Sequence, residues 1–333
     1  MSIYLQRSGQ NARHIPVMLD EALAALAPCD GGTYVDGTFG LGSYTCAILE
    51  AADTTVWAID RDPEAIRRGA VLIEEYDPRL TLLQGRFGEM SNLLGGAGIE
   101  KVDGIVLDLG VSSPQIDDAH RGFSFRFDGP LDMRMEKAGQ SAADVINTMD
   151  EDKLAQLIKE LGEERRARRV ARAIVEARSG SPITRTSELA AIVRRALPQG
   201  RSKIDPATRT FMALRLHVNE ELEELEAGLR AAEKLLVPGG RLVVISFQSL
   251  EDRRVKLFLR ERGGALPSSS RHLPPSQPKY PASFNLLRRS AEKPGVDEIA
   301  HNPRARSARL RVAERTAMAA WPREFQFGGD EKR

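Results

Sequence analysis

Tyr34–Tyr44 reads YVDGTFGLGSY, and this stretch decides the fold that the sequence predicts. A short apolar run ends at Asp36, glycines follow at positions 37, 40 and 42, and a helical pattern begins near Ser43. Glycines let the backbone turn tightly and approach a ligand, while the N-terminus of a helix offers free N–H groups. We therefore predict a strand, a ligand-binding turn and a helix in immediate succession.

The same alternation of strand and helix continues on both sides of this turn. Strands of the buried type are predicted at Thr33–Gly37, Thr55–Asp60, Leu80–Gln84, Gly104–Asp108 and, much later, Arg241–Phe247. Helical patterns such as Ser43–Ala51 and Pro63–Glu75 lie between them, and Ala308–Glu314 alternates like a late edge strand. Strict alternation is typical of a parallel sheet wrapped by helices. The predicted class is therefore α/β, with a doubly wound and mostly parallel sheet.

The sheet pattern is interrupted in the middle of the chain. Residues 141–200 contain several short amphipathic segments and no strand candidate, and one long helix follows. Asp205 is the expected N-cap of that helix, and Pro238 is expected to stop it. We predict one discontinuous domain, residues 1–129 and 205–333, with an all-helical insertion of residues 130–204. The Pro- and Ser-rich residues 263–283 predict a mobile surface loop.

Basic residues concentrate in the insertion although the whole chain is almost neutral. The 333 residues carry 48 Lys and Arg against 47 Asp and Glu, whereas residues 161–210 carry twelve against five, a local balance of +7. In one predicted helix, four arginines form a basic face and the opposite face is apolar. The arginines are Arg165, Arg168, Arg169 and Arg172. This face fits contact with a polyanion such as RNA. The alternative is a solvated face paired with Glu163 and Glu164.

The composition excludes several other classes of protein. Hydrophobic residues make up 41% of the chain and charged residues 29%, which allows a sizeable core and argues against wholesale disorder. Two cysteines and five scattered histidines form neither a disulfide framework nor a metal-ligand spacing, so no metal site is expected. The sequence has no signal-peptide pattern and no apolar run that could span a membrane. The expected location is the cytoplasm, without membrane contact.

The glycine turn predicts a nucleoside cofactor that lacks phosphate. Its spacing is G-x-x-G-x-G, which differs from the G-x-G-x-x-G of pyrophosphate binders. Asp36 before the turn suits a cationic ligand such as S-adenosylmethionine, which carries a sulfonium and an ammonium. Asp60 at the end of the second strand can accept both ribose hydroxyls, and Phe87 after the third strand can pack on adenine. In the alternative interpretation, Asp60 only caps the following turn and Phe87 is a core residue.

A long loop rich in Gly, Phe, Asp and Arg follows the fourth strand. Asp108 ends that strand, at the edge where open α/β sheets bind their ligands. Phe123, Phe125 and Phe127 alternate with small or basic residues, which suits stacking with the unpaired bases of single-stranded RNA. The alternative is that these phenylalanines only anchor the insertion to the sheet.

Eight motifs, in order along the chain, resemble one known family. They are HIPVMLDEAL, YVDGTFGLGSYT, AIDRDPEAI, DLGVSSPQIDDAHRGFSFRFDGPLDMRM, GEERRARRVARAI, DPATRTFMALRLHVNEELEEL, LVPGGRLVVISFQSLEDR and NPRARSARLRVAER. They run from about His14 to Arg315, and the chain resembles the bacterial 16S ribosomal RNA cytosine-N4 methyltransferase family. The resemblance implies a class I methyltransferase fold with a helical insertion and S-adenosylmethionine as methyl donor. It also implies a cytidine in the decoding region of 16S rRNA, in the small ribosomal subunit, as acceptor.

The resemblance also implies which residues hold the cofactor. By position they are Gly42, Ser43, Tyr44, Asp60, Phe87, Asp108 and Gln115, to which the glycine turn adds Asp36 and Gly40. Family members often have Gly-His where this chain has Ser and Tyr at positions 43 and 44, which predicts a backbone contact there. Many carry histidine at the positions of Asp205 and Gln248, and we expect neither position to be essential for the chemistry.

Asp108 is the candidate for a catalytic role. The lone pair of the cytosine amine is delocalised into the ring, so a carboxylate that accepts hydrogen bonds from this amine would favour a pyramidal nitrogen. Exocyclic-amine methyltransferases with an Asp/Asn-Pro-Pro-Tyr motif use this strand end, but here Leu109 and Gly110 follow. Asp108 binding only the cofactor is therefore the alternative.

Other functions and the oligomeric state stay open at this point. The chain could methylate another RNA, a protein or a small metabolite, or it could be a non-catalytic ribosome-assembly factor. The basic insertion argues against the protein and metabolite substrates. The presence of Asp36, Asp60 and the glycines argues against the non-catalytic role. A homodimer is also left open.

Overall fold

The computed structural model describes residues 16–197, 204–264 and 280–322 of the 333-residue chain. Contacts within the chain divide it into two compact units, Met1–Gly110 with Glu224–Arg333 and Val111–Glu223. The insertion predicted at residues 130–204 lies inside the second unit, which reaches further along the chain at both ends. Most of the loop predicted at residues 263–283 lies outside the described residues.

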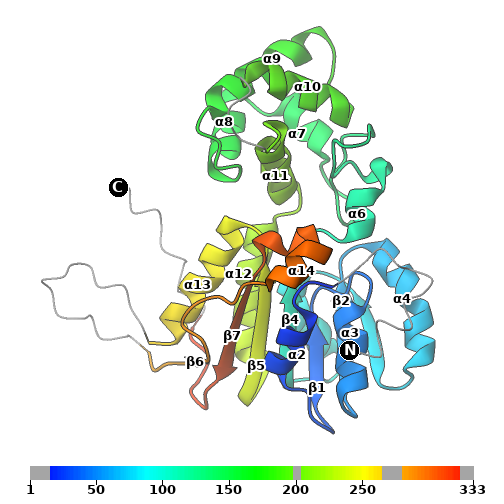
Figure 1. The fold of residues 1–333 in the computed structure, drawn as a ribbon, viewed down its shortest axis with the longest axis vertical. Coiled ribbons are helices and arrows are strands. Elements are labelled where there is room, and N and C mark those ends of the chain that lie inside the picture. The colour runs from blue at the N-terminus through cyan, green and yellow to red at the C-terminus, as the bar shows by residue number, and fades with distance from the viewer. Residues whose placement is uncertain (1–15, 198–203, 265–279, 323–333) are drawn as a thin grey trace, which may run out of the picture. The chain divides into compact units, whose positions relative to one another are not determined.

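A seven-stranded sheet forms the centre of the first unit (Figure 1). Its order is β3-β2-β1-β4-β5-β7-β6, with parallel neighbours from β3 to β5 and with β7 antiparallel to β5 and β6. The strands are β1 (Thr33–Asp36), β2 (Thr55–Asp60), β3 (Leu80–Gln84), β4 (Val102–Asp108), β5 (Leu236–Ser246), β6 (Phe284–Leu286) and β7 (Arg309–Arg315). The predicted α/β class with a mostly parallel sheet is confirmed.

The edge position predicted for the last strand is wrong. β7 pairs with β5 on one side and with β6 on the other, so β6 takes the edge. β6 contains only three residues. A strand this short cannot show an alternation of apolar and polar side chains, so no pattern in the sequence indicates it.

Helices cover both faces of the sheet. They are α2 (Leu19–Leu26), α3 (Ser43–Ala51), α4 (Pro63–Glu75), α5 (Met90–Gly96), α12 (Glu221–Leu235, from Glu224 on in this unit), α13 (Ser249–Arg262) and α14 (Val296–His301). One buried cluster joins the sheet to α5, α12 and α13 through Leu94, Leu229 and Phe258. A second joins it to α2, α3 and α4. The adjacent residues Tyr34 and Val35 of β1 lie in different clusters, as side chains on opposite faces of a strand do, so the sheet is doubly wound.

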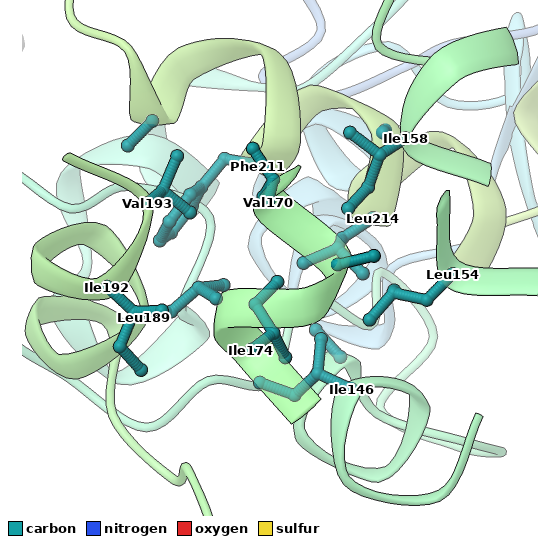
Figure 2. Packing of buried hydrophobic residues seen from close by; sticks show 14 of the residues in the cluster. Ile146, Leu154, Ile158, Val170, Ile174, Leu189, Ile192, Val193, Phe211 and Leu214 are labelled. Carbon is teal, nitrogen blue, oxygen red and sulfur yellow. The ribbon is translucent and has the colours of Figure 1, made fainter. Parts of the chain in front are cut away.

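The described residues of the second unit contain helices and no strand, and they have a core of their own. The helices are α6 (Ser113–Asp117), α7 (Ala142–Thr148), α8 (Glu151–Glu160), α9 (Ala167–Gly180), α10 (Thr186–Ala196) and α11 (Ala207–Val218). Figure 2 shows Val170 and Ile174 projecting from α9 into the space between the other helices. These two residues, with Ala167 and Ala171, form the buried face of α9. The predicted helical insertion with an amphipathic helix is confirmed.

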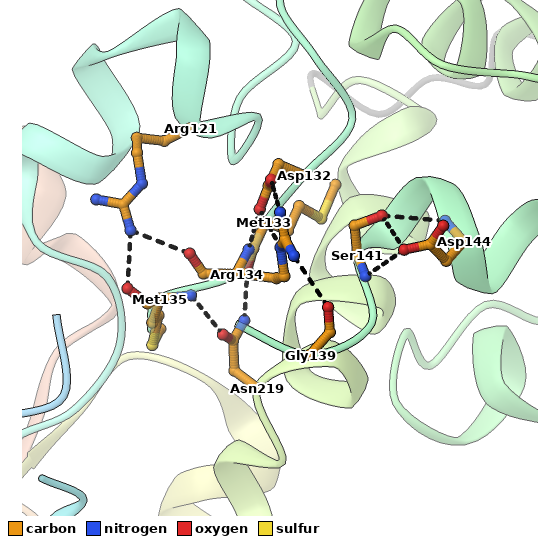
Figure 3. A network of polar contacts seen from close by, with 9 residues as sticks. All are labelled: Arg121, Asp132, Met133, Arg134, Met135, Gly139, Ser141, Asp144 and Asn219. Carbon is orange, nitrogen blue, oxygen red and sulfur yellow. Dashed lines mark hydrogen bonds and ion pairs between the residues drawn. The ribbon is translucent and has the colours of Figure 1, made fainter. Parts of the chain in front are cut away.

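The single long helix predicted after the insertion is wrong, because the structure has two helices there. α11 ends at Val218, and Glu220 has a left-handed φ of 51°. Between them, the buried amide of Asn219 donates to the carbonyl of Met133 and accepts from the N–H of Met135, both at 2.8 Å (Figure 3). The apolar repeat runs through this break without interruption. The break depends instead on the contacts of Asn219 with Met133 and Met135, which lie 86 and 84 positions earlier in the chain. A local sequence pattern cannot indicate such contacts.

Candidate functional site

The turn after β1 is tied to both neighbouring strands. Toward β4, the Gly37 amide donates to a backbone carbonyl at 3.0 Å, and the Asp108 amide donates to Thr38 Oγ1 at 2.7 Å. Toward β2, the Phe39 amide donates to a backbone carbonyl at 3.0 Å. These bonds hold the turn at the carboxyl edge of the sheet, where β1, β2 and β4 end. This edge is the usual ligand site of an open α/β sheet.

Asp36 is fully buried at the end of β1, and no cationic side chain of the described residues pairs with it. Its carboxylate accepts from the Thr38 amide at 3.1 Å and from Thr45 Oγ1 at 2.7 Å. Burial raises the pKa of Asp36 to about 6, and these hydrogen bonds limit the rise. The carboxylate is therefore mostly ionised at neutral pH, and a bound cation would stabilise it.

Asp60, at the end of β2, faces the glycine turn. One carboxylate oxygen accepts from the Gly40 amide at 2.7 Å, and the other accepts from the Asp62 amide at 2.8 Å. Asp60 thus does cap the following turn, but each oxygen has a second lone pair that could accept from a ribose hydroxyl. Burial raises the pKa of Asp60 to about 6. Its contact with a ribose stays a prediction.

Gly40 and Gly42 give the turn its shape. Both have left-handed backbone angles, with φ of 55° and 77°. A Cβ added to Gly42 would lie 2.6 Å from the Leu72 side chain and 2.9 Å from the Phe39 ring. Glycine is therefore needed at position 42 for both conformation and packing, and the backbone enters α3 directly from this residue.

Ser43 and Tyr44 are the first residues of α3, and both are buried. Tyr44 belongs to the hydrophobic cluster that includes α2 and α3, and its hydroxyl donates to the backbone carbonyl of Val17. The ring and the hydroxyl are both engaged in packing. Any cofactor contact at this position would therefore come from the backbone.

Phe87 opens a short 3-10 helix, η1 (Phe87–Glu89), after β3. Its ring packs on α12, where a Cβ added to Gly228 would lie only 2.4 Å from Phe87 Cδ2. The residue is nevertheless only half-buried. The ring packs against the core, as the alternative interpretation holds, and the contact of the partly exposed residue with an adenine stays a prediction.

Asp108 ends β4 and has a buried oxygen without a partner. Oδ1 is shielded from solvent and accepts no hydrogen bond from any described residue. Burial, and after it the charges of Asp36 and Glu251, raise the pKa of Asp108 well above its usual range. An unsatisfied buried acceptor costs about 1–3 kcal/mol. A ligand that donates a hydrogen bond or carries a positive charge would remove this cost.

Gln115 lies on α6, which belongs to the second unit. The other predicted site residues belong to the first unit. Its side chain is buried, and Oε1 accepts from the Ser112 amide at 3.0 Å in a capping box. This bond explains the local conformation of α6. The contact of Gln115 with a cofactor stays a prediction.

The two positions that depart from the family pattern both cap helices. Asp205 accepts from the Ala207 amide at 2.9 Å, at the start of α11, and pairs with Arg194 at 2.7 Å. Gln248 forms a capping box with Glu251 at the start of α13, and the Glu251 carboxylate accepts from the Gln248 amide at 3.0 Å. Both residues therefore have a local structural role, and the expectation that neither is essential for the chemistry stays a prediction.

Sequence reasoning does not identify Thr38 and Thr45, although both contact the acidic residues of the site. Thr38 connects Asp36 with Asp108, since its amide donates to the first and its hydroxyl accepts from the amide of the second. Thr45 donates its hydroxyl to Asp36. The only feature of the sequence that could indicate them is their distance from Asp36, which is two positions for Thr38 and nine for Thr45. Threonines at such spacings occur in many unrelated turns, so the signal is uninformative.

The basic face of α9 is exposed in the second unit. Of the four arginines predicted to form it, Arg168, Arg169 and Arg172 lie on α9, whereas Arg165 lies in the turn before the helix; all four are exposed. Arg172 lies 3.6 Å from Glu151, whereas Arg168 and Arg169 form no ion pair with any described residue. Glu164 is buried and pairs with an arginine of α11 at 3.4 Å. The interpretation as a solvated face of paired charges therefore does not apply to the two central arginines.

No group of three or more His, Cys, Asp or Glu side chains in the described residues is arranged to hold a metal ion. None of the helices in the same residues has the length and apolar character needed to cross a membrane.

Comparison with known proteins gives matches along nearly the whole chain. The MraW methylase family matches residues 11–316, which include both units and every residue of the candidate site. Ribosomal RNA small subunit methyltransferase H of Rhodospirillum centenum is 60% identical over 307 residues, covering 92% of this chain and 93% of that protein. The protein of the same name from Rhizorhabdus wittichii is 58% identical over 312 residues, covering 93% of this chain and 95% of the relative.

Proposed function

Because the chain belongs to the MraW methylase family, we propose that it transfers a methyl group from S-adenosylmethionine to the exocyclic N4 amine of a cytidine in 16S rRNA. The curated relatives are small-subunit ribosomal RNA methyltransferases, and the motifs of the chain resemble those of cytosine-N4 enzymes. The structural observation that supports this best is the acidic edge of the sheet. There Asp36 is buried and Asp108 is half-buried with one shielded oxygen, and neither has an ion-pair partner among the described residues.

The candidate site fits a cationic nucleoside cofactor. S-adenosylmethionine supplies a methyl group that is already activated by its positive sulfonium. The negative charges of Asp36 and Asp108 suit the sulfonium and the ammonium. Asp60 would accept the ribose hydroxyls, the exposed part of Phe87 would pack against adenine, and the backbone at Gly42 would contact the cofactor at the start of α3.

Asp108 is the residue that we assign to the acceptor amine. Its half-exposed carboxylate would accept a hydrogen bond from the N4 amine and so localise the lone pair on the nitrogen. A cation bound beside Asp108 lowers its pKa and turns it into the ionised acceptor that this role requires. After transfer, the methylated nitrogen carries an extra proton, is strongly acidic and releases this proton to water.

The second unit would bind the RNA. The exposed arginines of α9 contact phosphates in this proposal, which supplies affinity but no base specificity. A double charge reversal, Arg168→Glu with Arg169→Glu, is expected to weaken binding to small ribosomal subunits by about tenfold or more and to reduce its salt dependence. The Kd for S-adenosylmethionine should not change. Both constants can be measured by filter binding and by calorimetry.

A matched charge reversal in the first unit serves as the control for this prediction. Arg67 and Arg68 in α4 have side chains that are 74% and 45% exposed, so Arg67→Glu with Arg68→Glu makes the same change in net charge at a site outside the proposed RNA surface. It should leave subunit binding nearly unchanged at moderate salt. Equal losses of RNA and cofactor binding in the α9 variant would contradict its role in RNA contact.

The proposed reaction is tested by methyl transfer to isolated small ribosomal subunits that lack the modification. We expect N4-methylcytidine in the 16S rRNA, detected by nucleoside mass spectrometry, and no label in ribosomal proteins or in large subunits. No modified cytidine from folded protein that binds the cofactor would refute the proposal. Label in protein would favour the alternative substrate class.

Two properties accompany the proposed function. Its substrate places the reaction in the cytoplasm, where small ribosomal subunits are assembled. The homodimer stays a prediction, and size-exclusion chromatography with light scattering on the full chain tests it.

A further inference from the structure

The three phenylalanines of the loop after β4 have different surroundings in the second unit. Phe125 packs edge-on against Phe211, with ring centroids 4.8 Å apart, and the Arg194 guanidinium lies 5.4 Å from its centroid. Phe123 packs against the core of this unit and lies 5.7 Å from the Arg121 guanidinium. These two are anchors, as the structural interpretation of the loop holds. Phe127 is 65% exposed and belongs to neither contact.

The backbone that carries Phe127 is held firmly although its side chain is exposed. Thr186 Oγ1, at the start of α10, lies 3.3 Å from the Phe127 carbonyl and accepts from the Gly129 amide at 3.1 Å. The Thr186 amide donates to the Gly129 carbonyl at 2.9 Å. On its other side, Gly129 is so close to Ala119 that an added Cβ would lie 1.8 Å from that carbonyl. An exposed aromatic ring on a fixed backbone loses little conformational entropy when it binds a partner.

The charges around Phe127 favour a nucleic acid as that partner. Arg126 is exposed, and its side chain forms no ion pair with any described residue. Hydrogen bonds from Ser187 and Arg185 lower the pKa of Asp128 to about 2, and its ion pair with Arg185 at 2.5 Å offsets its charge. The other exposed neighbour is Pro130. A single aromatic ring among charged neighbours is too small an apolar surface for a protein groove, but it matches one base next to one phosphate.

We propose that Phe127 is a stacking platform for an unpaired base of the RNA substrate and that Arg126 contacts the adjacent phosphate. The inference rests on the proposed function for the identity of the substrate, and it names a residue that would hold a base of that substrate. Aromatic rings stack on any base, so this contact adds affinity and positions the strand without reading its sequence.

Fluorescence quenching tests the stacking directly. Phe127→Trp places an indole at the platform, and a single-stranded RNA oligonucleotide should quench its emission once the signal of the two native tryptophans is subtracted. Val71→Trp is the matched control, because Val71 is 69% exposed on α4 in the other unit. We expect quenching for the first variant and none for the second. Equal quenching of both, or of neither, would overturn the proposal.

Truncation of the ring measures its contribution to binding. Phe127→Ala should weaken binding of the same RNA by about 5- to 100-fold, while Phe127→Tyr, which keeps an aromatic face, should stay within about threefold of wild type. The Kd for S-adenosylmethionine should be unchanged in both, and their far-UV circular dichroism should match that of the wild type and so show that the helical second unit is folded. Weaker binding to whole subunits without any change for free RNA would indicate a ribosomal protein as partner and would overturn the proposal.

The two proposals fail in distinguishable ways. Absence of methyl transfer by the wild-type protein would refute the proposed function, whereas quenching at position 127 by RNA would still show a base-stacking site. Methyl transfer by the wild-type protein together with normal RNA binding by Phe127→Ala would refute only the stacking platform.

Discussion

Asp108→Ala is expected to lower the kcat of methyl transfer to small ribosomal subunits by about 100- to 1,000-fold, the usual effect of losing one hydrogen bond to a developing charge. Asp108 ends β4 and is only half-buried, so its carboxylate is the acceptor that the N4 amine would find at this edge of the sheet. Asp108→Asn keeps an oxygen acceptor there. It should retain at least a tenth of the wild-type rate, measured by single-turnover transfer from labelled S-adenosylmethionine.

The pair of variants separates the two roles considered for Asp108. If the residue serves only to bind the cofactor through its charge, alanine and asparagine should raise the Kd for S-adenosylmethionine equally and leave kcat at saturation unchanged. Asp103→Asn is the matched control. Asp103 lies on the same strand and accepts from the Thr33 amide at 2.8 Å, a bond that asparagine can retain. This control should keep wild-type activity.

The cofactor edge is the part of the site that sequence predicts well, for a geometric reason. Asp36, Asp60 and Asp108 each end a strand, and the carboxyl ends of parallel strands meet at one edge of a sheet. Once the alternation of strand and helix is recognised, their proximity follows without any knowledge of tertiary contacts. The proximity shows in their electrostatics, because the charge of Asp60 raises the pKa of Asp36 and the charge of Asp36 raises the pKa of Asp108.

Features that depend on distant partners could not be predicted in this way. Tyr44 fits the cofactor motif by position, but its hydroxyl bonds to Val17, 27 residues earlier. The helix break at Asn219 is invisible for the same reason, because its amide bonds to Met133 and Met135 in another segment. The loop phenylalanines look equivalent in sequence, and only the packing of the second unit makes Phe125 an anchor while Phe127 stays exposed.

Acidification is expected to weaken cofactor binding strongly. Burial raises the pKa of Asp36 and of Asp60 to about 6, so both gain protons between about pH 7.5 and pH 5 in the free protein. A cationic ligand binds better to the ionised forms, and the proton must leave before it binds. The Kd for S-adenosylmethionine should therefore rise by about tenfold for each carboxylate involved, or about a hundredfold for both. Calorimetry in buffers of different ionisation enthalpy would detect the released protons.

Acidification is expected to act in the opposite direction on the stability of the free protein, because it should stabilise the fold. A carboxyl whose pKa is raised from 3.8 in the unfolded chain to about 6 in the folded one holds its proton more tightly when folded. Its contribution to stability is complete below about pH 4 and is lost as the pH rises through 6. Without a bound cation, the ionised carboxylates thus destabilise the free protein at the pH where they bind the cofactor best. Asp36→Asn should accordingly stabilise the free protein at neutral pH. In this variant the rise in the Kd for S-adenosylmethionine on acidification should be about tenfold smaller than in the wild type. A Kd that is independent of pH in the wild-type protein would contradict a role for these carboxylates in holding the cation.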